Sequence, residues 1–216
     1  MGALFYVLFI GLLVRDAGQE ALSYVLAGNL VSSLLFATRS FTENRFIFMR
    51  TSDTLDYFPT LPIWRNGLII AVVAAALVLS LPGLLTVVFI GSRILSLELN
   101  LNPLIWIVLP LSTLPFAALG ALIGTVTRSF EASNTVSTAV TLTLLILGPV
   151  IIPPNYLPEI LNILGRYNPA VYAASAFRQL LVGPVTTQLI FDLIAITGFT
   201  FLSLWFVGRH LEWQQK

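Results

Sequence analysis

Few residues in this sequence can carry out chemistry. The chain has no cysteine, a single histidine, His210, and a single lysine, Lys216, which is the last residue. Thiolate metal sites, disulfides and cysteine nucleophiles are therefore excluded, and one histidine cannot provide a histidine pair for a metal. A phosphate-binding loop of the Walker type ends in an internal lysine followed by Ser or Thr, so the chain has no ATPase site of its own. We expect no enzymatic activity, no metal and no cofactor bound by this chain.

Asp192 is the one carboxylate that the apolar stretches contain. Ion-coupled carriers place such groups inside their spans, which makes Asp192 a candidate coupling residue. Two interpretations of its position stay open. Asp192 either reaches the membrane interface from the end of its span or pairs with Arg178, towards which the Gly183-Pro184 turn folds the chain. Neither a His–Ser arrangement nor an aspartate pair lies in the apolar stretches, so intramembrane catalysis is not indicated.

The composition indicates an integral membrane protein. Of the 216 residues, 57% are hydrophobic and only 10% are charged, with a mean hydropathy of +0.91. A soluble domain carries about 25% charged residues and needs them to cover its surface. The net charge of +1 is too small to attract nucleic acid.

Charge-free stretches predict six membrane-spanning helices. A helix needs about 20 apolar residues to cross the bilayer. The predicted spans are 2–14, 21–38, 66–91, 103–126, 132–152 and 187–207. The stretch 2–14 is short and is interpreted as a first span rather than a signal peptide, because no basic residue precedes it. Serines and threonines in the spans are expected to hydrogen-bond and pack between helices.

The basic residues predict that both termini lie in the cytoplasm. With that orientation seven basic residues lie inside, against four outside. The inside set is Arg39, Arg45, Arg50, Arg65, Arg128, Arg209 and Lys216, and the outside set is Arg15, Arg93, Arg166 and Arg178. This distribution follows the positive-inside rule for a multi-pass protein of the cytoplasmic membrane.

Two segments are neither spans nor simple loops. Residues 43–62, on the cytoplasmic side, contain both charged and large apolar side chains. Pro59 and Pro62 stop a helix near the end of this segment. They predict either an amphipathic helix in the lipid interface or a helix that docks into a groove of a cytoplasmic partner. Residues 153–184, on the outer side, contain five prolines and two short helical patterns. They predict a hairpin that dips into the outer leaflet or, alternatively, two helices on its surface.

The segment before the third span resembles the coupling segment of type-2 ABC exporter permeases. The run from Arg50 to Arg65 reads RTSDTLDYFPTLPIWR, and the family has a Gly-Thr-Leu-Glu-like turn followed by Pro-Ile/Val-x-Arg. The positions that match, together with the apolar anchor Phe58, are Thr54, Leu55, Asp56, Leu61, Pro62, Ile63 and Arg65. The resemblance implies that these residues dock an ATPase. Asp53 stands where the family usually has glycine.

The outer segment also resembles that family. The YLP sequence at 156–158 and the run YNPAVYAASAFR at 167–178 are similar to its re-entrant outer hairpin. The candidate residues of the hairpin and the translocation route are Asn168, Pro169, Arg178 and Gly183, with Asp192.

The resemblance implies a six-span, all-α permease with a cytoplasmic coupling helix and a re-entrant outer hairpin. Two such subunits, identical or different, would work with two separate ABC ATPase subunits, which use ATP and Mg²⁺. The uncharged spans favour export of an amphipathic or lipid-like substrate such as a drug, a lipid or a glycan. Two other functions stay open, namely a membrane scaffold that binds a non-ATPase partner and a secondary carrier that uses Asp192.

Overall fold

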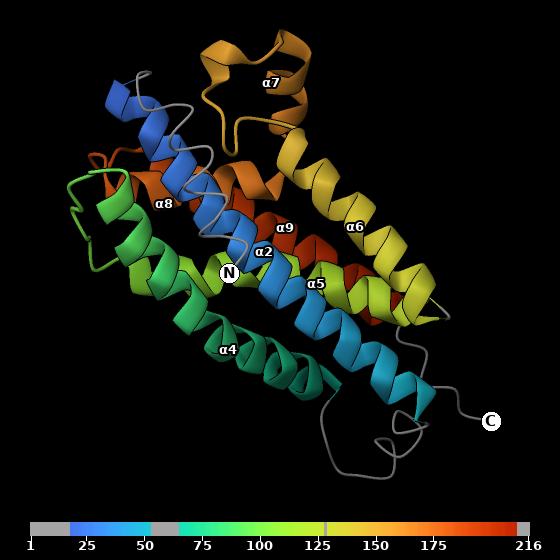
Figure 1. Cartoon of the computed structure of the whole chain (residues 1–216). Coiled ribbons are helices and arrows are strands. Elements are labelled where there is room, and N and C mark those ends of the chain that lie inside the picture. The colour runs from blue at the N-terminus through green and yellow to red at the C-terminus, as the bar shows by residue number, and fades with distance from the viewer. Residues whose placement is uncertain (1–17, 53–64, 128, 211–216) are drawn as a thin grey trace.

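The computed structural model describes residues 18–52, 65–127 and 129–210, and its regular elements in these ranges are all helices (Figure 1). This confirms the all-α prediction. The helices are α2 (Gly18–Thr51), α4 (Arg65–Ile94), α5 (Ile105–Val126), α6 (Phe130–Ile146), α7 (Glu159–Gly165), α8 (Pro169–Leu181) and α9 (Gln188–His210), with a 3-10 turn η3 (Pro154–Tyr156).

Four of these helices are long and apolar enough to cross a membrane. The candidate spans are Gly18–Met49, Ile70–Ile94, Ile105–Val126 and Gln188–Val207. Several hydroxyls inside them bond to the carbonyl one turn earlier, as Thr42 does to Thr38 and Thr200 to Ile196. These bonds satisfy the hydroxyls within the helix, as expected for an apolar environment. The predicted span 2–14 lies outside the described residues, and the predicted span 132–152 is not among these four. The count of six therefore stays a prediction.

Helix α2 is longer than the predicted span 21–38. It continues without interruption for 34 residues, which corresponds to about 50 Å, and ends at Thr51. The sequence prediction ended the span at Arg39 and began a connection at Glu43 because both residues are charged. The prediction that the helix ends at Thr38 is wrong, because α2 continues through Arg39 and Glu43, which pair with each other on one face. Where the membrane ends along α2 stays a prediction.

Helix α6 is shorter than the predicted span 132–152 and ends at Ile146. Gly148 has a φ of +120°, a conformation that L side chains rarely adopt. Pro149 follows and has no N–H to continue the helix. The Gly148-Pro149 pair therefore turns the chain away from the α6 axis and towards α7 and α8.

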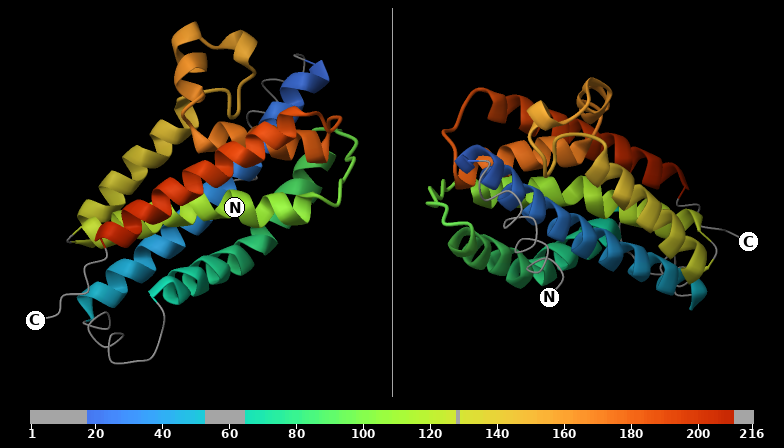
Figure 2. Two further views of the ribbon diagram at one scale, coloured as in Figure 1. Left: turned by 180° about the vertical axis from the view of Figure 1, so that it is seen from behind. Right: turned by 45° about the horizontal axis from the view of Figure 1, so that its top comes forward.

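Helix α2 contacts α4, α5, α6 and α8, and α5 lies between α2 and α9, which also packs against α8 (Figures 1 and 2). The approach of α2 to α5 is close, because a Cβ on Gly120 would lie 2.4 Å from the Arg39 carbonyl oxygen. A Cβ on Gly124, one turn later, would lie 2.7 Å from the Glu43 carbonyl oxygen. Small residues of this spacing permit close packing of helices in membranes.

The outer segment forms two short helices at the predicted positions. Helix α8 buries most of its side chains against α2, α5 and α9, with Phe177 and Leu180 fully enclosed. Helix α7 exposes Ile160, Ile163 and Leu164 and stands apart from the bundle (Figures 1 and 2). Two helices joined at Arg166–Asn168 agree with a hairpin, and its depth in the membrane stays a prediction.

Candidate functional site

The described residues contain one ion pair, and it is buried between two helices. Arg39 donates from Nη1 to Oε2 of Glu43 at 2.8 Å, and each residue is only 4% exposed. The two residues are four positions apart on α2, which places their side chains on the same face of the helix. Arg39 also donates to Ser40 Oγ at 3.1 Å.

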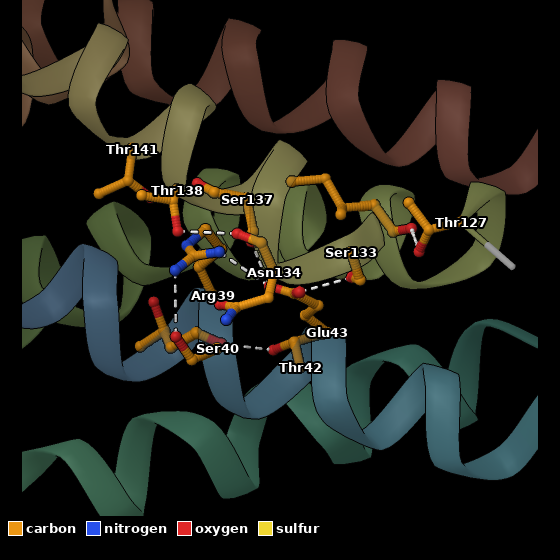
Figure 3. Close-up of polar contacts among 12 residues, drawn as sticks. Arg39, Ser40, Thr42, Glu43, Thr127, Ser133, Asn134, Ser137, Thr138 and Thr141 are labelled. Atoms are coloured by element: carbon orange, nitrogen blue, oxygen red, sulfur yellow. Dashed lines mark hydrogen bonds and ion pairs between the residues drawn. The ribbon is translucent and has the colours of Figure 1, made fainter. Parts of the chain in front are cut away.

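Helix α6 completes this cluster from the other side (Figure 3). Ser133 donates a hydrogen bond to Oε1 of Glu43, and Ser137 donates to Oε2. Both serines are fully buried and lie one turn apart, so they match the two oxygens of a single carboxylate. Ser129 fixes the start of this helix, because its side chain accepts from the Ala132 N–H. We call Arg39, Glu43, Ser133 and Ser137 the Glu43 cluster.

The Glu43 cluster connects α2 to α6 through two side-chain hydrogen bonds. Both carboxylate oxygens of Glu43 are hydrogen-bonded, which removes much of the cost of burying its charge. The pair carries no net charge, so it is tolerated in a span far better than either residue alone. In the part of the chain that the structure describes, no group of three metal-binding side chains is present. The hydrogen bonds that connect the two helices both end on one carboxylate.

Asn168 connects the other end of α6 to α8. Its side-chain oxygen accepts from the Ala170 N–H and caps α8, whose first residue is Pro169. Its Nδ2 donates to the carbonyl oxygens of Leu144 and Leu147, both at 2.6 Å. One side chain thus satisfies backbone groups at the end of one helix and the start of the next. The two predicted hairpin residues Asn168 and Pro169 lie together at this junction.

Asp192 is enclosed by amide groups. It is 0% exposed, and its oxygens accept from Gln179 Nε2 at 3.1 Å and from Gln188 Nε2 at 3.2 Å. The Asp192 side chain is therefore enclosed by the chain instead of extending from the end of its span, and its depth in the membrane stays a prediction. The alternative ion pair with Arg178 is wrong, since no Arg178 nitrogen lies within 4.0 Å of Asp192. The Arg178 guanidinium instead lies over the Tyr24 ring, 3.8 Å from its centroid.

Comparison with protein families identifies the chain. Residues 1–182 match the family model described as ABC-2 type transporter. The chain belongs to the ABC-2 transporter family. No curated protein matches the chain.

Membership in the ABC-2 family establishes the general role of the bundle. Together with the apolar helices, it makes the chain an integral membrane protein and a permease subunit of an ABC transporter. ABC-2 permeases are not themselves catalytic and work with an ABC ATPase partner. The Glu43 cluster therefore lies in a transport domain.

The structure brings together only part of the predicted site of this ABC-2 permease. Thr54, Leu55, Asp56, Phe58, Leu61 and Pro62 lie outside the described residues, and Arg65 is the first residue of α4. Gly183 follows α8, close to Gln179 and Arg178. Arg39, Glu43, Ser133 and Ser137 were not predicted. The i, i+4 spacing of Arg39 and Glu43, in a stretch without Gly or Pro, was the available signal.

Proposed function

We propose that this permease exports an amphipathic or lipid-like substrate across the cytoplasmic membrane, driven by separate ABC ATPase subunits. Residues 43–62 act as the coupling segment, and Leu55, Phe58 and Leu61 are the apolar anchors that dock on the ATPase. Both chain termini face the cytoplasm, in keeping with the positive-inside rule. The uncharged surface of the spans favours a substrate that partitions into lipid.

The continuity of α2 carries this proposal. The helix runs from the buried Glu43 cluster to Thr51, only a few residues before Leu55 and Phe58. A movement of the docked segment therefore acts on α2 directly. The Glu43 cluster passes the movement to α6, and Asn168 passes it from α6 to α8. Packed helices of this kind move as rigid bodies over small distances.

The uncovered face of α6 supports a second permease subunit. Ser133, Ser137 and Thr141 on this helix are buried against the rest of the chain. The opposite face is exposed and mixed. Val136, Leu142 and Ile146 are apolar, and the hydroxyls of Thr135, Thr138 and Thr143 bond to the carbonyl one turn earlier. Its first turns also expose Glu131 and Asn134, which are unfavourable in contact with hydrocarbon and favour a protein partner or a water-filled path. A second copy of this chain or a related permease, packed against this face of α6, provides the protein contact and encloses the water-filled path.

Co-purification with the ATPase tests the docking step. Replacing Leu55 and Phe58 together by glutamate removes two apolar anchors and should abolish co-purification in mild detergent while the permease still inserts. The matched control replaces Ile160 and Leu164, which are exposed on α7, by glutamate. The control should retain the ATPase. Equal recovery of the ATPase with both double variants would contradict docking through residues 43–62.

The driving force distinguishes the exporter from a secondary carrier. In proteoliposomes that contain permease and ATPase, substrate movement should require ATP and continue after the proton gradient is collapsed. Movement without ATP that stops in Asp192→Asn and on collapse of the gradient would favour the carrier instead. That result would refute the exporter without bearing on the fold.

A further inference from the structure

A pocket lies where α2 begins, α8 ends and α9 begins. It has a volume of about 380 Å³, which is within the range of small-molecule sites. Several polar side chains line it, namely Gln19 and Glu20 from α2, Ser175 and Arg178 from α8, Thr186 from the turn before α9 and Gln188, its first residue. Such a concentration of polar side chains is unusual in a chain with 10% charged residues.

Two opposite charges line this pocket without neutralising each other. Glu20 and Arg178 both belong to the lining, yet no Glu20 oxygen lies within 4.0 Å of an Arg178 nitrogen. Within the described ranges, the ion pair is that of Arg39 and Glu43. A pocket with separated charges of opposite sign complements a dipolar ligand. A simple anion would be repelled by Glu20, and a simple cation by Arg178.

The Arg178 side chain is positioned for an anionic group. Its guanidinium carbon lies 3.8 Å from the centroid of Tyr24, a buried ring, so a cation–π contact holds the guanidinium at this place. A cation–π contact acts through the face of the ring and does not by itself use the N–H donors of a guanidinium. A guanidinium held in this way matches the oxygens of a phosphate in a bidentate manner.

Hydrogen bonds behind the pocket hold Asp192 out of direct contact with this arginine. Gln179 donates to Asp192, and its Oε1 accepts from the N–H and the hydroxyl of Thr186 at 3.1 and 2.8 Å. Gln188 donates to the other oxygen of Asp192. Both oxygens of Asp192 are thus occupied by amides. These side chains are hydrogen-bonded without a ligand, and a preformed arrangement reduces the entropy cost of binding.

We propose that this pocket binds a phosphoethanolamine group, with its phosphate on Arg178 and its ammonium on Glu20. An ammonium has N–H donors for the carboxylate, whereas the quaternary nitrogen of choline has none. The pocket lies at Gly18 and Gln188, where two candidate spans begin, so it is at the depth of lipid headgroups. This binding goes beyond the proposed export function and needs no ATPase.

Lipid binding to the purified full chain in detergent tests the inference. Native mass spectrometry would compare phosphatidylethanolamine, phosphatidylcholine and phosphatidylglycerol, with soluble glycerophosphoethanolamine as a fourth probe. Phosphatidylethanolamine should bind about tenfold more tightly than the other two lipids, since only its ammonium makes a charge-assisted hydrogen bond to Glu20. Competition by glycerophosphoethanolamine at equal affinity identifies a soluble source, and weaker competition identifies a lipid. Equal binding of the three lipids would overturn the proposal.

Substitutions of Arg178 and Glu20 test which part of the headgroup each charge binds. Arg178→Gln should weaken binding of phosphatidylethanolamine about tenfold or more, and Glu20→Gln should remove its preference over phosphatidylglycerol. Arg166→Gln and Glu159→Gln, both at exposed positions near α7, are the matched controls and should bind like the parent. If Arg178→Gln does not fold, Arg178→Lys keeps the charge and removes the planar fork. A folded Arg178→Lys or Glu20→Gln chain with the parent's lipid selectivity would overturn the assignment.

Discussion

Replacing Glu43 by glutamine removes a charge from the centre of the bundle while preserving the size of the side chain. In the parent, Glu43 accepts hydrogen bonds from Arg39, Ser133 and Ser137. The glutamine amide has only one acceptor oxygen, so its NH₂ group faces one of these three donors. Arg39 also keeps its positive charge in a buried position without a carboxylate partner. Removing one partner of a buried pair costs about 3–5 kcal/mol, so we expect the free energy of unfolding to fall by that amount.

Denaturant titration in detergent, followed by circular dichroism, measures this loss. Glu131→Gln is the matched control, because Glu131 lies on the exposed face of α6 and surface changes stay within about 0.5 kcal/mol. A second variant, Arg39→Met with Glu43→Leu, replaces both charges by apolar groups of similar size. It should recover most of the stability that Glu43→Gln loses, since an apolar pair avoids burying a lone charge. If Glu43→Gln unfolds like Glu131→Gln, the buried pair does not have the energetic role described above.

Three further predictions concern the helix junctions. Gly120→Ala should lower the free energy of unfolding in the same titration, because its Cβ would lie 2.4 Å from the Arg39 carbonyl oxygen. Its control, Gly83→Ala, has open space around it and should be neutral or stabilising by up to about 1 kcal/mol. Asn168→Ala should cost at least about 1 kcal/mol and reduce hydrogen-exchange protection at the start of α8, because the cap is lost; unchanged protection would contradict the capping role. Pro169→Ala should alter substrate release or transport-linked ATPase stimulation and leave ATPase binding intact, and loss of ATPase binding alone would invert the proposed topology.

The general fold could be predicted because the membrane limits the possible structures. Apolar stretches identified α4, α5 and α9 almost to their ends, since only helices satisfy the backbone of an open chain in lipid. Proline positions located the break between α7 and α8 in the same way. The permease family was indicated by matching residues in the connection after α2 and in the outer hairpin.

The polar interior could not be predicted because it depends on distant contacts. Glu43 and Ser137 are 94 residues apart, and no local pattern pairs them. The prediction ended the span before Arg39 because an isolated arginine is costly in lipid. An arginine that pairs with a carboxylate one turn away, as Arg39 does with Glu43, is less costly there. For Asp192, the amides of Gln179 and Gln188 replaced the expected arginine, because Arg178 stacks on Tyr24 instead.

Transport by the Arg39→Met, Glu43→Leu variant tests the role of the Glu43 cluster most directly. The variant is reconstituted with its ATPase in proteoliposomes, and ATP hydrolysis and substrate movement are measured together. If the cluster transmits movement from the docked segment to α6, the variant should fold and bind the ATPase but hydrolyse ATP with little substrate movement. Substrate movement per ATP equal to that of the parent, in a correctly folded variant, would contradict coupling through α2 and α6.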